Sequence, residues 1–227
     1  MDEARMLADN GAPEGTVVIA REQTTGRGRF KRSWISPSGR NILFSVVFRP
    51  SSAQLNYVNM AATLAVSRAV ASLTGLKTSV KWPNDVRING RKVAGILIET
   101  AIEMEKPHFA IVGIGLNVNL VPSEYPEIAA IATSLYVETG RMHDMTGVLL
   151  AVLEQLDDLY GEVLQGRSLT DEWSVELETL GRMVRVQWRD QLFDGRAISV
   201  DEQGNLLLLN ADGSTVTVVA GEVTLQI

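Results

Sequence analysis

Two stretches of the chain repeat apolar residues at the three- and four-residue spacing of an amphipathic helix. They cover residues 53–73 and 148–164. Residues with this spacing lie on one side of a helix, so each stretch predicts a long helix with one buried face. A shorter helix is expected at residues 2–10, because Gly11 and Pro13 follow it and are typical of a helix end.

The segment between the two long helices carries the short apolar runs that are typical of strands. We predict strands at residues 43–48, 80–88, 93–102 and 108–118. Asn89-Gly90 is a strong hairpin signal between the second and third of these. Consecutive strands joined by short turns pair antiparallel. The pattern therefore predicts an α+β fold with a central mixed, mostly antiparallel sheet flanked by helices, and not a doubly wound parallel sheet.

The chain changes character after Gly181. Five short strands are predicted there and no helix, at residues 183–188, 193–200, 205–209, 215–220 and 223–225. Several short strands separated by turns fit a small barrel of the SH3 type. We therefore expect two domains, a larger α+β domain over residues 1–180 and an SH3-like domain over residues 181–227.

Composition narrows the class of protein. Apolar residues make up 45% and charged residues 21% of the 227, as in an ordinary globular protein. The net charge of −6 argues against a protein that coats nucleic acid or an anionic membrane. The chain has no cysteine, which excludes disulfides, cysteine-held metals and a thioester on the protein. No basic-then-apolar segment opens the sequence, so we expect a cytoplasmic location.

Against this acidic background, residues 21–40 are basic. This segment contains six Lys and Arg residues and one acidic residue, Glu22. Glycines allow backbone N–H groups to turn inward, and arginine offers forked donors to phosphate oxygens, so the loop is a candidate site for a small polyanion. A solvated basic loop is the alternative interpretation. The basic residues are Arg21, Arg27, Arg29, Lys31, Arg32 and Arg40.

Two lysines enter strands that otherwise look buried. Lys81 opens the run Lys-Trp-Pro-Asn-Asp, and Lys92 follows the Asn89-Gly90 turn. Lysine is rarely buried without a partner, so each is expected to meet an anion. Gly113 and Gly115 lie in a later strand, where glycine often marks the close approach of a ligand. A β-bulge capped by an asparagine remains an equal alternative there.

Taken in order, these motifs resemble those of the biotin protein ligase family, and the small β-module behind them strengthens the resemblance, which covers nearly the whole chain. The matching residues are Gly26-Arg27-Gly28-Arg29-x-x-Arg32-x-Trp34, Lys81-Trp82-Pro83-Asn84-Asp85, Arg91-Lys92-x-Ala94-Gly95-Ile96-Leu97-x-Glu99 and Gly113-x-Gly115-x-Asn117-x-Asn119.

The resemblance implies a two-step reaction. The carboxylate of biotin attacks the α-phosphate of ATP, releases pyrophosphate and forms biotinoyl-5′-AMP. A lysine of a biotin carboxyl carrier domain, from acetyl-CoA carboxylase or a related carboxylase, then attacks this anhydride. ATP implies Mg²⁺, which is coordinated largely by substrate phosphates and water. The sequence shows no cluster of carboxylates that would form a dedicated metal site. Relatives occur as monomers and as homodimers.

The resemblance also implies roles for individual residues, among them Trp34 stacking on adenine and Asp85 acting as the base for the acceptor lysine. The expected catalytic residues are Lys92, Arg27, Arg29 and Asp85. The expected biotin-binding residues are Gln23, Gly26, Arg27, Arg29, Lys92, Gly95, Ile96, Gly113 and Gly115. The expected nucleotide-binding residues are Arg29, Arg32, Trp34, Lys81, Asn84 and Asn117.

One expected feature is missing. Family members carry a Ser-Thr-Asn-like motif at the end of a first strand, and the chain begins at Met1, about where that Asn would stand. Either a first strand lies upstream of Met1, or the protein is a relative that binds biotin or its adenylate with impaired catalysis. There is also no room for a helix-turn-helix, so DNA binding is not expected. Lipoate–protein ligase is the remaining alternative, although the Gly-Arg-Gly-Arg loop and the C-terminal β-module favour biotin.

Overall fold

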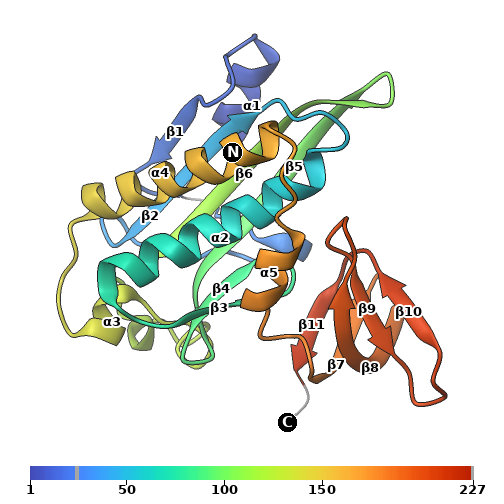
Figure 1. The fold of residues 1–227 in the computed structure, drawn as a ribbon. Coiled ribbons are helices and arrows are strands. Elements are labelled where there is room, and N and C mark those ends of the chain that lie inside the picture. The colour runs from blue at the N-terminus through green and yellow to red at the C-terminus, as the bar shows by residue number, and fades with distance from the viewer. Residues whose placement is uncertain (24–25, 226–227) are drawn as a thin grey trace.

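The computed structural model describes residues 1–23 and 26–225 and is built on a six-stranded antiparallel sheet (Figure 1). The strand order is β1-β2-β6-β5-β4-β3, which confirms the α+β class and the mostly antiparallel central sheet. Parallel contacts are the isolated bridges Val80–Leu177 and Lys92–Ala132. The strands are β1 (Val17–Ala20), β2 (Asn41–Phe48), β3 (Thr78–Lys81), β4 (Asp85–Ile88), β5 (Arg91–Glu103) and β6 (Lys106–Asn117).

The two long predicted helices cover one face of this sheet (Figure 1). They are α2 (Leu55–Thr74) and α4 (Met145–Leu164). The main core lies beneath them and takes alternate strand residues such as Phe44, Val46 and Val112. Because side chains alternate across a strand, the intervening residues of β2, β5 and β6 point to the opposite face.

The predicted N-terminal helix covers only part of that opposite face. In α1 (Asp2–Asp9), Ala4 and Ala8 are fully buried and pack with Val47, Phe109 and Ile111 in a second, smaller apolar cluster. This cluster lies near one end of β2 and β6. The rest of the face, toward Asn41 and Asn117, carries the pocket described below.

The structure differs from the predicted elements where local packing decides the path. The strand expected at residues 80–88 is divided by a tight turn at Trp82–Pro83, where the peptide bond is cis, and β3 pairs back on β4. The Asn89-Gly90 hairpin is confirmed, with Ile88 opposite Arg91. Sequence analysis missed β1, α3 (Leu135–Thr139) and α5 (Thr170–Glu176), which have 4, 5 and 7 residues. Segments this short show no clear period.

The five strands expected at the C-terminus are present, and they form one antiparallel sheet of order β10-β9-β8-β7-β11. The predicted SH3-like barrel is not closed, because β10 and β11 stand at opposite ends of this order and share no ladder within the described residues. The strands are β7 (Met183–Trp188), β8 (Gln191–Val200), β9 (Leu206–Leu209), β10 (Thr215–Val218) and β11 (Glu222–Leu225).

The turn before β9 joins this module to the rest of the chain. Gly204 accepts a 2.8 Å hydrogen bond from the indole nitrogen of Trp82, the residue that opens the β3–β4 turn. A side chain at Gly204 would have its Cβ 2.8 Å from the methyl of Met60 and 3.5 Å from the ring of Trp173, and Met60 and Trp173 are each 1% exposed. The turn is therefore wedged between α2, α5 and the β3–β4 hairpin.

We expect Gly204→Ala to lower stability more than Gly213→Ala. Both glycines have a positive φ, +77° and +84°, so each substitution carries the left-handed backbone cost of about 1–2 kcal/mol. Only Gly204 adds a clash with the buried methyl of Met60, whereas a Cβ at Gly213 meets nothing within 4 Å. Thermal unfolding followed by circular dichroism should show the larger fall in Tm for Gly204→Ala. Equal falls would mean that the contact at Met60 relaxes freely.

Candidate active site

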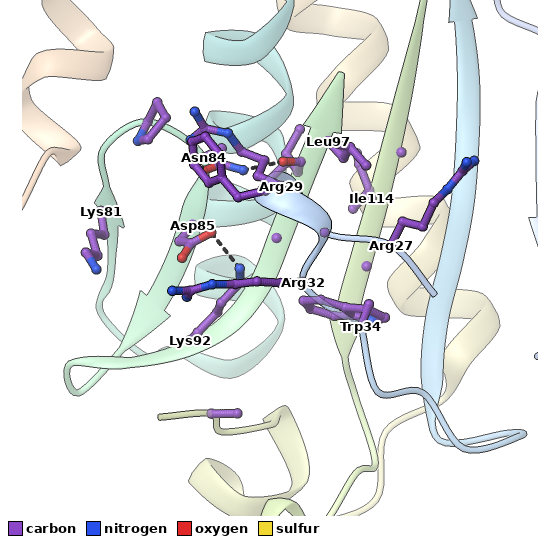
Figure 2. Close-up of a pocket in the computed structure, with 18 of the residues that line it drawn as sticks. Arg27, Arg29, Arg32, Trp34, Lys81, Asn84, Asp85, Lys92, Leu97 and Ile114 are labelled. Carbon is purple, nitrogen blue, oxygen red and sulfur yellow. Dashed lines mark hydrogen bonds and ion pairs between the residues drawn. The ribbon is translucent and has the colours of Figure 1, made fainter. Parts of the chain in front are cut away.

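The basic loop folds back on itself and lies over the open face of the sheet (Figure 2). The N–H of Gly28 donates to the carbonyl of Arg32 at 2.7 Å, and the N–H of Trp34 donates to the carbonyl of Gly26 at 3.0 Å. Phe30, in the short 3₁₀ turn Arg29–Lys31, has a φ of +54° and completes the reversal. The loop is thus a wall of a cavity and not a fully solvated segment. Thr24 and Thr25, which belong to the basic loop, lie outside the described residues.

A cavity of ≈ 530 Å³ lies between this loop, the sheet and β11. Gly26 is the predicted site residue that does not line it. A Cβ at Gly26 would overlap the carbonyl oxygen of Trp34 and lie 3.1 Å from the side-chain oxygen of Gln23, so Gly26 lets the two ends of the loop meet. The predicted residues that line the cavity are Gln23, Arg27, Arg29, Arg32, Trp34, Lys81, Asn84, Asp85, Lys92, Gly95, Ile96, Gly113, Gly115 and Asn117.

The floor of the cavity is a patch of glycines on adjacent strands. Gly95 on β5 is opposite Gly115 on β6. Gly113 lies two residues before Gly115 on β6, so it is on the same face of the sheet. The ring of Trp34 lies against this floor, since a Cβ at Gly115 would be 2.6 Å from its Cε2. The sulfur of Met1 lies over Gly113, 2.7 Å from where a Cβ would be. Without a Cβ, the strands let these large side chains come down onto the backbone.

The two lysines of the cavity differ in their partners. Lys92 Nζ lies 2.6 Å from Asp85 Oδ1 and 5.4 Å from the centre of the Trp34 ring (Figure 2). This ion pair agrees with the expectation that Lys92 meets an anion. Lys81 has no ion pair within 4 Å among residues 1–23 and 26–225. Burial lowers the pKa of Lys81, although the nearby carboxylate of Asp85 acts in the opposite direction.

Arg29 is the second cation of the cavity lining that lacks an ion pair within the described residues. Its Nη1 donates a 3.1 Å hydrogen bond to Oδ1 of Asn84, a neutral amide (Figure 2). Asn84 is itself anchored, because its Nδ2 donates to the carbonyl of Ile96 on β5. Burial lowers the pKa of the Arg29 guanidinium, and the carboxylates of Asp85 and Glu222 partly oppose this. The side chain is thus held over the cavity at the cost of its hydration.

Arg27 and Arg32 instead tie the loop to its surroundings. Arg27 points away from the Asp85–Lys92 pair and forms an ion pair with Asp2 of α1 (Figure 2). Arg32 forms an ion pair with Glu222 of β11. Both arginines are at least half exposed, at 50% and 66%, so each pair contributes little stability and can exchange for another anion.

Two polar atoms at the cavity lack a partner within the described residues. Asn117 is 3% exposed; its Nδ2 donates to the carbonyl of Thr133 at 3.0 Å, but its Oδ1 has no donor. The indole nitrogen of Trp34 is also buried without an acceptor. Buried polar groups are normally satisfied, so these two atoms mark positions where a bound molecule can supply the missing hydrogen bond.

Sequence analysis missed the cavity residues that come from outside the motifs. Met1, Ser45, Ile131, Ala132 and Glu222 are the clearest cases. None belongs to a recognisable local pattern. They reach the cavity because the chain between β6 and α3, the helix α1 and the C-terminal module fold against it, which a single sequence does not reveal.

Among the residues that the structure describes, six cations and two carboxylates line the cavity, an excess that suits a ligand with several negative charges. The cations are Arg27, Arg29, Arg32, Lys81, Arg87 and Lys92, and the carboxylates are Asp85 and Glu222. Within the described ranges, no group of three His, Asp or Glu side chains could hold a metal ion. In the same ranges, no helix is both long and apolar enough to span a membrane.

Comparison with known proteins places this architecture. Residues 6–117 match the model of the biotin/lipoate A/B protein ligase family, and residues 179–225 match the biotin protein ligase C-terminal domain. The chain is 35% identical over 215 residues to the bifunctional ligase/repressor BirA of Bacillus subtilis, covering 92% of this chain and 66% of that protein. It is 35% identical over 221 residues to the biotin–[acetyl-CoA-carboxylase] ligase of Mycobacterium tuberculosis, covering 92% of this chain and 79% of that one.

A solved structure extends the similarity to the whole fold. The biotin protein ligase of Aquifex aeolicus in complex with biotin and ATP superposes with a TM-score of 0.82 at 31% identity, covering 98% of this chain and 94% of the other. The family predicted from four short motifs is therefore confirmed by both halves of the chain. Sequence, fold and cavity agree, and the chain belongs to the biotin protein ligase family.

Proposed function

We propose that the cavity binds biotin and MgATP, forms biotinoyl-5′-AMP, and passes the biotinoyl group to a lysine of a carboxyl carrier domain. The observation that carries this proposal is the pair of partly buried cations, Arg29 and Lys81, that have no ion pair within the described residues. A desolvated cation is costly unless an anion joins it, so the site is preorganised for a polyanion. The adenylate and its precursors supply such charge.

In the first step, a carboxylate oxygen of biotin forms a bond to the α-phosphorus of ATP. The bond from this phosphorus to the bridging oxygen breaks, and pyrophosphate leaves with the electron pair. Lys92 and Arg29 stabilise the negative charge on the phosphoryl oxygens. Both side chains are already held in the cavity, Lys92 by Asp85 and Arg29 by Asn84. Mg²⁺ enters with the ATP as part of the substrate.

In the second step, the amine of the acceptor lysine attacks the carbonyl carbon of the anhydride and AMP leaves. An amine with a pKa of about 10.4 must first lose a proton. Asp85 is the proposed acceptor of this proton, since its carboxylate lies in the cavity 2.6 Å from Lys92. Trp34, which now lies on the glycine floor, offers an aromatic surface on which adenine would stack.

Several finer points belong to the same proposal. We assign residues 1–180 to a catalytic domain and 181–227 to a C-terminal domain, supported by the change from helix α5 to the β7–β11 sheet. Gln23, Gly95, Ile96 and Gly113 are proposed to line the biotin subsite, and Arg32 and Asn117 the nucleotide subsite. A cytoplasmic location, where ATP is abundant, fits the cysteine-free sequence. The chain spans 66% of the length of the bifunctional Bacillus subtilis relative, so we propose for it the ligase reaction alone.

Biotin is favoured over lipoate as the acyl substrate. The family model that covers residues 6–117 includes both kinds of ligase, but the match at residues 179–225 is to a biotin protein ligase domain. With MgATP and a carrier domain, we expect pyrophosphate release and carrier labelling with biotin and neither with lipoate. Turnover with lipoate alone would reverse this assignment. Tight binding of biotin with neither product would indicate a relative that only binds.

We expect Lys92→Ala to lower the rate of biotin-dependent pyrophosphate release by about 10²–10³-fold, the usual effect of removing one preorganised group that stabilises developing negative charge. Its melting temperature should change little, because Lys92 and its partner Asp85 are both partly exposed, at 30% and 25%, so water can solvate the carboxylate that loses its ion pair. Lys77→Ala, at an exposed position outside the cavity, is the matched control and should keep full activity. A fully active Lys92→Ala enzyme would remove Lys92 from the catalytic residues.

We expect Gly26→Ser to speed the escape of biotinoyl-5′-AMP more than Gly28→Ser does. A Cβ at Gly26 overlaps the Trp34 carbonyl and must push the two ends of the loop apart. A Cβ at Gly28 lies 3.5 Å from the Arg32 carbonyl, which is an ordinary contact. Release of labelled adenylate from each variant, chased with unlabelled biotin, gives the two rates. Identical rates would show that closure of the loop at Gly26 does not retain the intermediate.

A further inference from the structure

Glu138 of α3 is a buried carboxylate outside the cavity, and three donors converge on it: two from the distant β4–β5 turn and one from Thr133, in the segment just before α3. Its side chain is only 6% exposed. Asn89 Nδ2 donates to its Oε2 at 2.7 Å and Arg91 Nη2 to its Oε1 at 2.8 Å, both from the β4–β5 turn. The hydroxyl of Thr133 also donates to Oε1. A carboxylate can accept all three hydrogen bonds at once, whereas a neutral amide cannot.

These donors flank Lys92 on both sides. The N–H of Lys92 donates to the carbonyl of Ile131 at 2.9 Å, and the N–H of Thr133 donates to the carbonyl of Lys92 at 2.8 Å. The backbone of Lys92 is thus bridged to the segment that precedes α3. Glu138 therefore accepts hydrogen bonds from both partners of this bridge: from Asn89 and Arg91, next to Lys92 in the β4–β5 turn, and from the side chain of Thr133.

We propose that Glu138 is a positioning residue that acts through Lys92. By fixing the β4–β5 turn against Thr133, it sets the backbone from which the Lys92 ammonium reaches Asp85 and the reacting phosphate. The inference rests on the proposed function for its catalytic consequence, but not for its structural one. Displacement of a reacting group by about 1 Å can cost on the order of 10²-fold in rate.

The first measurement is hydrogen exchange of backbone amides in the full chain, which needs no activity. Glu138→Gln keeps the size of the side chain but replaces one acceptor oxygen by a donor, so it opposes one of the three bonds. We expect the amides of Lys92 and Thr133 to exchange about tenfold faster in this variant, while those of β6 keep their protection. Unchanged exchange at both amides would overturn the proposal, whatever the enzyme does.

The second measurement is a double-mutant cycle on adenylate formation. Glu138→Gln should lower kcat about tenfold, with KM values for biotin and ATP changing less than twofold. Added to Lys92→Ala, it should lower kcat no further. Thr133→Val removes one of the three donors, so it should also lower kcat, but by less than Glu138→Gln does. Glu127→Gln is the control, because it loses a carboxylate from an exposed position in the preceding segment and should match the wild type.

The outcomes separate the structural effect of Glu138 on the backbone of Lys92 from its effect on catalysis. Multiplicative effects of Glu138→Gln and Lys92→Ala, at temperatures well below each melting transition, would mean that Glu138 only stabilises the fold and would overturn its role through Lys92. A wild-type chain that forms no adenylate would contradict the proposed function. In that case, faster exchange at Lys92 and Thr133 in Glu138→Gln would still support the positioning of Lys92.

Discussion

The site depends on a single physical constraint: Arg29 and Lys81 are held partly out of water above a floor of glycines, and no carboxylate pairs with either within the described residues. The glycines of β5 and β6 allow Trp34 and the basic loop to descend onto the sheet. Arg29, on this loop, is thereby partly buried, and its hydrogen-bond partner is a neutral amide. Residues with a Cβ at Gly95 and Gly115 would lift the loop, rehydrate these cations and remove the reason for a polyanion to bind.

The loop is held at its margins by weak and replaceable contacts. Arg27 and Arg32 pair with carboxylates on α1 and β11 while remaining at least half exposed. Exposed pairs of this kind are worth about 0–1 kcal/mol, so they bias the loop toward the cavity without locking it there. The groups nearest the chemistry are held more firmly, since Asn84 is anchored to β5 and Lys92 is bridged at its backbone to residues 131–133.

The C-terminal module takes part in building the site. Glu222 of β11 lines the cavity and pairs with the basic loop, and Gly204 accepts a hydrogen bond from Trp82, two residues before Asn84. The module therefore touches both walls of the cavity. An account of catalysis confined to the central sheet would leave out the only other carboxylate, besides Asp85, that lines the cavity within the described residues.

Sequence patterns predicted the long helices and the central hairpins, because these depend on periods and on local turn motifs. The site residues rested on the family resemblance; all of them except Gly26 line the cavity, and their individual roles stay predictions. The patterns did not predict the break of the 80–88 strand at Trp82–Pro83, since an apolar run hides a tight turn. Nor did they predict Ile131, Glu138 or Glu222, whose effects arise only when distant segments pack together. The unclosed C-terminal sheet is of the same kind, because barrel closure depends on how its edge strands meet.

The most direct test of the central claim is a crystal structure of the chain with a non-hydrolysable analogue of biotinoyl-5′-AMP. Our account predicts that the analogue fills the cavity, with its phosphate-like group against Arg29 and Lys92 and with the basic loop closed above it. An analogue bound elsewhere, or bound in the cavity with both of these side chains turned to solvent, would contradict it.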